Sequence, residues 1–431
     1  MLLNDADTCT GSLGSCPTQD VSPPAALPHL RDLRLALFSG NYNCVTDGAN
    51  QALNRLVAFL EAHGAAVRVY SPTVENPAFD PAGTLVSLPS VPVPKRPEYR
   101  IALSLPKSVQ RDLDGFRPNV VHISAPDVAG YLAVRYARAR GITAVASVHT
   151  RFDTYLGYYR LGALEGLARA YLRHLYSRCS QVYAPSPCMI DTLRADRIES
   201  DIRLWSRGVD RERFSPRHRD PAWRQANGWR PEDVVILFVG RLVLEKGLDT
   251  FARAVEQVRH EGSRPKVLVV GDGPAAGWFH NRLPEAVFTG HLSGASLSRA
   301  YASSDIFFNP SRTETFGNVT LEAMASGLPT VCAQSTGSTF LVRQGVTGFL
   351  VDPRASEDYA HWLARLVSDP ELRRRTGRGG LRASGAFEWN EVMLPLARGY
   401  RAALDAQHRH RAPAAEISTH RMQPSGVGSA R

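Results

Sequence analysis

The stretch VVILFVGRLVLEKG, residues 234–247, is the part of the chain that most directly indicates its fold. Its first six residues, Val234–Val239, are all apolar and predict a buried β-strand. Gly240 and Arg241 follow the strand directly, and Lys246 lies in the same loop. The stretch therefore predicts a strand that delivers two cations to the loop at its carboxyl end.

Strands and helices alternate from this stretch toward the C-terminus. Such alternation implies a parallel sheet whose strands are joined by crossover helices. The expected strands are Lys266–Val270, Ile306–Asn309, Thr330–Ala333 and Phe349–Val351, and the expected helices are Thr250–Arg259, Leu297–Ser303 and residues 318–326.

The same alternation precedes the stretch and breaks around Ile202–Pro216, which holds a glycine and a proline but no long periodic run. We therefore predict an α/β fold of two Rossmann-like, doubly wound domains that face each other across a cleft, where ligands usually bind. The expected strands of the first domain are Leu33–Ser39, Val67–Tyr70, Val120–Ile123, Val145–Val148 and Val182–Ala184, with helices at Gln51–His63 and Tyr131–Arg140.

The expected domains are residues 31–205 and 206–385, followed by a terminal helix at 386–405 that can pack back on the first domain. Residues 1–30 and 406–431 are polar and are expected to be disordered tails.

The chain has 431 residues, with 51 Lys and Arg against 41 Asp and Glu, a formal net charge of +10. This excess favours anionic partners such as phosphate esters, nucleic acid or an anionic membrane surface. The six cysteines form no CxxC pair, which argues against a structural zinc site and fits a reducing cytoplasm. No apolar run approaches the roughly 20 residues of a membrane span, and the N-terminus lacks a signal-peptide pattern. We therefore expect a cytoplasmic protein.

Two carboxylates flank the predicted start of the helix at 318–326. Glu314 lies just before this helix, and Glu322 lies about one turn inside it. The free N–H groups and the dipole at a helix start attract an anion, and Arg241 and Lys246 suit a diphosphate. This pattern indicates a phosphate site with carboxylates on either side to accept hydrogen bonds from hydroxyls. Alternatively, the cations are solvated loop residues and the carboxylates only stabilise the helix dipole or the surface.

The motifs together resemble those of the retaining GT-B glycosyltransferases of family 4, over about residues 33–400. The likeness is strongest to the branch of bacterial lipid mannosyltransferases and sulfoquinovosyl-diacylglycerol synthases. The matching segments are TDGANQALNRL at 46–56, PNVVHISAPDVAGYLA at 118–133, SVHT at 147–150, RLWSRGVDRERFSP at 203–216, GRLVLEKG at 240–247, VVGDGP at 269–274, VFTG at 287–290, LSRAYASSDIFFNPSRTETFGNVTLEAMASGLPTV at 297–331 and GFLVDP at 348–353.

The resemblance implies a metal-independent hexosyltransferase that moves mannose, glucose or a related sugar from a GDP- or UDP-sugar with retention of configuration. The second domain would bind this donor and the first the acceptor. By position, Arg241 and Lys246 would hold the donor diphosphate. Glu322 would accept hydrogen bonds from the ribose, and Glu314 would bind hydroxyls of the transferred sugar.

Further site residues follow from the same resemblance. Gly48 would let the backbone approach the donor, and His149 would face the donor sugar and the acceptor as a catalytic residue beside Glu314, Arg241 and Lys246. The segment Thr46–Gly48 departs from the two glycines that many relatives have there, so Asp47 is an alternative contact for donor or acceptor. The backbone amides of four residues would contact the phosphates or the sugar: Phe316, Gly317, Asn318 and Val319.

No metal site or other cofactor is expected. Asp112 and Asp114 form a DxD pair, but they lie in a charged stretch with helical character. The charge needed at a departing diphosphate would come from Arg241, Lys246 and the helix amides instead.

The acceptor is expected to be a lipid. Gly157–Cys179 and Lys95–Arg111 combine apolar and basic residues, so either segment suits an anionic bilayer, which would place the protein peripherally on the inner face of the plasma membrane. The alternative for both segments is an ordinary amphipathic helix of the core.

Other functions remain open at the level of the sequence. An exopolysaccharide or lipopolysaccharide precursor is an alternative acceptor, and a nucleotide-binding protein without transferase activity is an alternative class. Nucleic acid is not an expected partner because interleaved basic and aromatic motifs are missing. A dinucleotide-binding oxidoreductase is disfavoured because Ala276 stands where the third glycine of GxGxxG belongs.

Overall fold

The computed structural model describes residues 29–45, 47–93, 96–149, 165–355 and 357–411. The tails expected at the two ends fall largely on residues 1–28 and 412–431, which lie outside the described residues. The same holds for Thr46, Lys95, Thr150 and the first part of the segment Gly157–Cys179.

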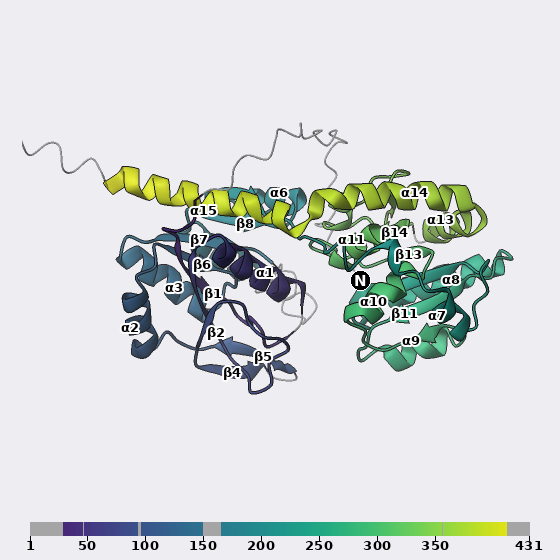
Figure 1. The fold of residues 1–431 in the computed structure, drawn as a ribbon, viewed down its shortest axis with the longest axis horizontal. Helices are drawn as coiled ribbons and strands as arrows, with labels where there is room; N and C mark the ends of the chain where they lie inside the picture. The colour runs from purple at the N-terminus through teal and green to yellow at the C-terminus, as the bar shows by residue number, and fades with distance from the viewer. Residues whose placement is uncertain (1–28, 46, 94–95, 150–164, 356, 412–431) are drawn as a thin grey trace, which may run out of the picture.

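Two parallel sheets form the centres of two α/β halves (Figure 1). The first sheet has seven strands in the order β3-β2-β1-β6-β7-β8-β9, and all its pairs are parallel. Its strands are β1 Arg34–Phe38, β2 Ala66–Ser71, β3 Thr84–Ser87, β6 Val120–Ile123, β7 Thr143–Ser147, β8 Gln181–Ala184 and β9 Asp201–Leu204.

Helices cover both faces of the first sheet, and a two-stranded hairpin lies beside it. The helices are α1 Gly48–Ala62, α2 Lys107–Phe116, α3 Val128–Ala139, α5 Glu165–Tyr176 and α6 Pro187–Ala195, and the hairpin strands are β4 Ser90–Val93 and β5 Arg96–Ala102.

The second sheet has six strands in the order β12-β11-β10-β13-β14-β15, again all parallel. Its strands are β10 Val235–Val239, β11 Lys266–Val270, β12 Val287–Phe288, β13 Ile306–Asn309, β14 Thr330–Ala333 and β15 Gly348–Val351. Its helices are α7 Pro221–Ala226, α8 Leu248–His260, α9 Ala276–Arg282, α10 Gly294–Ala302, α11 Asn318–Ala325, α12 Ser338–Leu341, α13 Glu357–Ser368 and α14 Pro370–Ala383.

The strand orders confirm the predicted pair of doubly wound sheets. The order reverses between β1 and β6 in the first sheet and between β10 and β13 in the second. At such a reversal the loops after neighbouring strands diverge and leave a crevice outside the carboxyl ends of the strands. Each half therefore offers one crevice for a ligand.

The sequence pattern places a break at Ile202–Pro216, but the structure continues the first sheet through part of this segment. Asp201–Leu204 forms β9 and pairs with β8 at the edge of the sheet. The strand has no continuous apolar run because its four residues are all partly or fully exposed. The irregular connection between the halves therefore begins after Leu204.

The last helix, α15 at Trp389–Arg411, returns from the second half and runs along the first (Figure 1). Leu396 and Tyr400 are fully buried, in one apolar cluster with Leu53 and Leu56 of α1. The helix also continues through residues 406–411, where the polar sequence predicted a tail. The Gln407 amide there donates to the carbonyl of Gly141, which ties the last turns to the first half.

Among the helices of the described residues, none has the combination of length and apolar character that crossing a membrane requires.

Candidate active site

A cleft of about 1110 Å³ lies between the two halves, and loops at the carboxyl ends of both sheets line it. All ten site residues proposed from the sequence are among its lining residues, so the fold brings them to one place. They are Gly48 and His149 from the first half and Arg241, Lys246, Glu314, Phe316, Gly317, Asn318, Val319 and Glu322 from the second.

Lys246 and Glu314 form an ion pair at the floor of the cleft. The Lys246 Nζ donates to Glu314 Oε1 at 2.7 Å, and both side chains are partly buried. Lys246 ends a short 3₁₀ turn after β10, and Gly247 follows in the left-handed region at φ 74°. A Cβ at Gly247 would lie 2.8 Å from the Pro310 carbonyl oxygen, so glycine is required where this turn meets the loop after β13.

The start of α11 faces the cleft without a side-chain cap. Gly317 precedes the helix at φ 95°, a left-handed conformation that favours glycine, and no side chain accepts from the first N–H groups. The first helical turn therefore keeps N–H donors and the positive end of the dipole available for an anion.

Glu322 lies about one turn into α11 and also lines the cleft. The buried Tyr301 hydroxyl of α10 donates to Glu322 Oε2 at 2.9 Å. Burial raises the pKa of Glu322 to about 7, and the Tyr301 hydrogen bond opposes this rise only in part. The carboxyl group therefore changes its charge close to neutral pH.

Arg241 follows β10 with an exposed side chain that lines the cleft. Its loop packs directly on the loop after β11, where Gly271 has φ 139°. A Cβ at Gly271 would lie 1.9 Å from the Gly240 carbonyl oxygen, which no side chain permits. The close packing of Gly240 and Gly271 thus holds the loop of Arg241 at the part of the cleft that the second half lines.

Gly48 opens α1, and Asp47 caps this helix by accepting from the Asn50 N–H at 2.8 Å. A Cβ at Gly48 would lie 2.0 Å from Nδ2 of Asn318, so the two halves approach closely here. The sequence predicts that Gly48 makes room for a donor. The geometry adds that it makes room for Asn318 at the start of α11.

His149 follows β7, and both of its ring nitrogens already have partners. Nε2 lies 2.8 Å from the Ser147 hydroxyl, and Nδ1 accepts from Arg207 at 2.5 Å. Burial, and then the positive charge of Arg207, holds the pKa of His149 well below its usual range, so the ring is neutral. Sequence reasoning missed Arg207, although it lies within the quoted segment RLWSRGVDRERFSP.

The DxD pair has structural partners. Asp112 accepts from Arg68 and from the Tyr70 hydroxyl. Asp114 accepts from the Tyr136 hydroxyl at 2.7 Å and from Arg140. Within the described residues, no group of three or more His, Cys, Asp or Glu side chains is placed to hold a metal ion.

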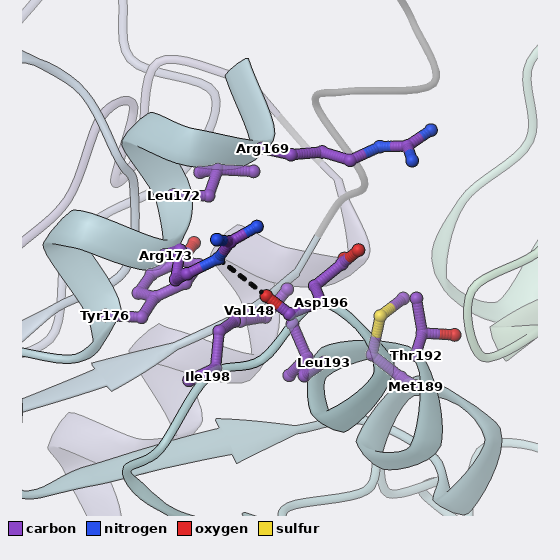
Figure 2. Close-up of a pocket in the computed structure, with 10 residues that line it drawn as sticks. All are labelled: Val148, Arg169, Leu172, Arg173, Tyr176, Met189, Thr192, Leu193, Asp196 and Ile198. Atoms are coloured by element: carbon purple, nitrogen blue, oxygen red, sulfur yellow. Dashed lines mark hydrogen bonds between the residues drawn. The ribbon is translucent and has the colours of Figure 1, made fainter. Parts of the chain in front are cut away.

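A second, smaller pocket lies between α5 and α6 in the first half (Figure 2). Its walls are mainly apolar side chains such as Leu172, Met189 and Leu193. The Arg173 Nε donates across it to the Asp196 carbonyl oxygen at 2.9 Å. Because this pocket has neither the paired lysine and glutamate nor the helix N-terminus of the interdomain cleft, we take the cleft as the candidate active site.

Two family models match the chain. Residues 46–213 match the model described as Glycosyltransferase Family 4, and residues 233–369 match that of Glycosyl transferases group 1. The first matched segment lies mainly in the first half and the second lies in the second half, and these halves meet at the cleft.

Curated relatives and a solved structure agree with these matches. The chain is 34% identical to a GDP-mannose-dependent alpha-mannosyltransferase of Mycolicibacterium smegmatis, over 86% of this chain and 98% of that protein. It is 33% identical to a protein of the same name from Corynebacterium glutamicum, over 75% of this chain and 78% of that protein. The fold resembles sucrose-phosphate synthase from Thermosynechococcus elongatus with a TM-score of 0.71 at 20% identity, covering 87% of this chain and 100% of that one.

The raised pKa of Glu322 predicts a pH-dependent effect of Glu322→Gln on stability. The folded chain holds the proton to about pH 7, whereas the group ordinarily titrates at 4.5, so ionisation destabilises the wild type as pH rises through this window. Glutamine removes this loss. We expect Glu322→Gln to be more stable than wild type by about 3 kcal/mol at pH 8 and nearly equal to it at pH 4.5, measured by thermal unfolding.

The matched control is Glu232→Gln, because Glu232 is exposed. It should leave stability unchanged at both pH values. A stability difference between Glu322→Gln and wild type that does not vary with pH would contradict the assignment of the raised pKa to Glu322.

Proposed function

Because this chain belongs to the family 4 glycosyltransferases, we propose that it transfers a hexose from a nucleotide sugar to a lipid acceptor with retention at the anomeric carbon. Its glycosyltransferase activity follows from the family models and the curated relatives. The observation that carries the rest of the proposal is the cleft, where two cations and an uncapped helix start lie beside two carboxylates.

The donor diphosphate binds between Arg241, Lys246 and the start of α11 in this proposal. Arg241 offers a planar pair of donors and Lys246 a compact charge. Glu322 accepts from the ribose hydroxyls, and Glu314 accepts from hydroxyls of the transferred sugar. The Lys246–Glu314 ion pair supports this arrangement because it holds the phosphate-binding cation and the sugar-binding carboxylate 2.7 Å apart, as neighbouring groups of one donor require.

GDP-mannose is the donor we favour. The two relatives reported above share about a third of their aligned residues with this chain and carry the name GDP-mannose-dependent alpha-mannosyltransferase. UDP-glucose and other GDP- or UDP-sugars are the alternatives that the experiment below includes.

The proposed chemistry is front-face transfer. The bond between the anomeric carbon and the diphosphate oxygen breaks, and the acceptor oxygen bonds to that carbon on the same face. The acceptor proton passes to the departing diphosphate. Arg241, Lys246 and the α11 amides stabilise the negative charge that develops there, and no metal ion is needed. The neutral His149 ring borders the sugar and the acceptor from the first half.

The acceptor is proposed to reach the cleft from an anionic membrane surface at the β4–β5 hairpin. Val91 and Leu103 at this hairpin are 42% and 50% exposed. The hairpin is fixed to the loop after β1, where Asn41 Oδ1 accepts from the Arg100 N–H at 2.8 Å, and its Tyr99 lines the cleft. An apolar surface beside the cleft would let a lipid head group enter while its chains stay in the bilayer.

A panel of GDP- and UDP-sugars with extracted bacterial lipids tests the proposed activity. We expect GDP-mannose to be consumed fastest, the product to keep the α configuration by NMR, and the rate to be unchanged in EDTA. No transfer from any donor would contradict the proposal, an inverted product would contradict the mechanism, and loss of activity in EDTA would contradict metal independence.

Removal of either partner of the central ion pair should abolish transfer without unfolding the chain. We expect Lys246→Ala and Glu314→Ala each to lower kcat/KM at least about 100-fold, because each removes a group aimed at charge that develops in the transition state. Circular dichroism and thermal unfolding serve as the folding controls. Turnover within about threefold of wild type in either variant would remove that residue from the site.

Flotation with liposomes that contain phosphatidylglycerol tests the membrane surface. We expect wild-type protein to float with these liposomes and Leu103→Asp to float at least several-fold less, because the change places a charge on the proposed contact. Val346→Asp is the matched control, since Val346 is 54% exposed but lies in the second half. Equal flotation of the two variants would contradict docking through the hairpin.

A further inference from the structure

Arg207 is a buried cation on the first-half side of the cleft. It is only 4% exposed and follows β9 in the connection between the halves. Its NH2 group donates to His149 Nδ1 at 2.5 Å, and its guanidinium lies 5.1 Å from the centre of the Trp205 ring. Both partners are neutral, so neither balances its charge.

Arg224 shows how the same chain usually pairs such a cation. It is also 4% exposed, but it forms an ion pair with Asp305 at 3.0 Å and donates to the carbonyl oxygens of Ser303 and Asp233. Within the described residues, Asp47 is the carboxylate whose charge acts on Arg207, and the two form no ion pair within 4 Å. A buried charge without a close counter-ion is costly, so an anionic ligand beside Arg207 would offset part of this cost.

The hydrogen bond to His149 fixes the orientation of Arg207 and of a chain of buried groups behind it. Arg207 can only donate, so His149 Nδ1 accepts and His149 Nε2 carries the proton to Ser147 Oγ. Ser147 Oγ also lies 2.9 Å from His122 Nε2, and His122 Nδ1 lies 2.6 Å from the Tyr400 hydroxyl, both within hydrogen-bond distance. Tyr400 of α15 stands at the far end of this series and does not itself contact Arg207.

We propose that Arg207 binds an anionic oxygen of the substrate, a phosphate or carboxylate oxygen, from the first-half side of the cleft. One N–H group is held by His149, and the others are available where the side chain lines the cleft. The start of α1, at Gly48 and Ala49, lines the same wall of the cleft, and its helix dipole adds attraction for an anion. The capping residue Asp47 carries a negative charge there, which an anionic ligand must displace or avoid. The inference rests on the proposed function and extends it to a third cation.

The anionic oxygen has two possible sources, the donor diphosphate or an acidic head group of the acceptor. Comparing the binding of GDP with that of GMP tests the donor diphosphate as the source, because GMP lacks the second phosphate. Neutral and acidic fractions of the lipid extract, separated by anion exchange, distinguish the second source in transfer kinetics.

Arg207→Gln is the test variant because it removes the positive charge. Loss of a charge-assisted hydrogen bond weakens binding roughly 10- to 100-fold. If Arg207 binds the diphosphate, calorimetry will show GDP affinity reduced about 10- to 100-fold and GMP affinity unchanged. If it binds the acceptor, GDP affinity will be unchanged and the KM for the acidic lipid fraction will rise by the same factor, with the KM for the neutral fraction unchanged.

Tyr400→Phe is the matched control because it removes the far end of the buried chain and leaves the cleft intact. It should change thermal stability but no KM or affinity. If Arg207→Gln does not fold, Arg207→Lys is used. It should weaken GDP affinity, or raise the KM for the acidic lipid fraction, about three- to tenfold, because lysine lacks the planar pair of donors. A folded Arg207 variant with GDP affinity and both KM values within twofold of wild type would overturn the inference. Normal GDP binding by wild-type protein keeps this outcome distinct from failure of the proposed function.

Discussion

All strands within each main sheet run in the same direction, and the geometry of the cleft depends on this constraint. Parallel strands end at one edge of a sheet, so every loop that follows a strand emerges on the same side. The two such edges face each other across the cleft, which is why residues as distant as Gly48 and Asn318 lie in contact. The return of α15 to the apolar cluster of α1 ties the second half to the first.

The charged side chains of the cleft differ in whether they form an ion pair within the chain. Lys246 and Glu314 neutralise each other, and Asp305 balances Arg224 far from the cleft. Glu322 and Arg207 are different because the hydrogen bonds they make join them to neutral groups, the Tyr301 hydroxyl and the His149 ring. Burial raises the pKa of Glu322, and Arg207 is the third cation that we propose binds the substrate.

Much of the fold and site was predictable from local patterns. The strands β6, β11, β13 and β14 lie where the apolar runs predict them, because strands covered on both faces need continuous apolar sequence. The edge strand β9 and the last turns of α15 were not predictable in this way, since their residues are mixed or polar and their pairing partners are distant in the chain. The same limit applied to Arg207, whose importance depends on His149, 58 residues earlier.

The sequence by itself determined the family, the pair of doubly wound sheets and the identity of the residues that line the cleft, because each of these follows from short apolar runs, glycines and motif order. The tertiary structure alone decided which charges are paired, that both His149 nitrogens are occupied, and that Arg207 stands buried with neutral partners. Burial and hydrogen-bond geometry depend on groups far apart in the chain, and no local pattern of residues encodes their distances.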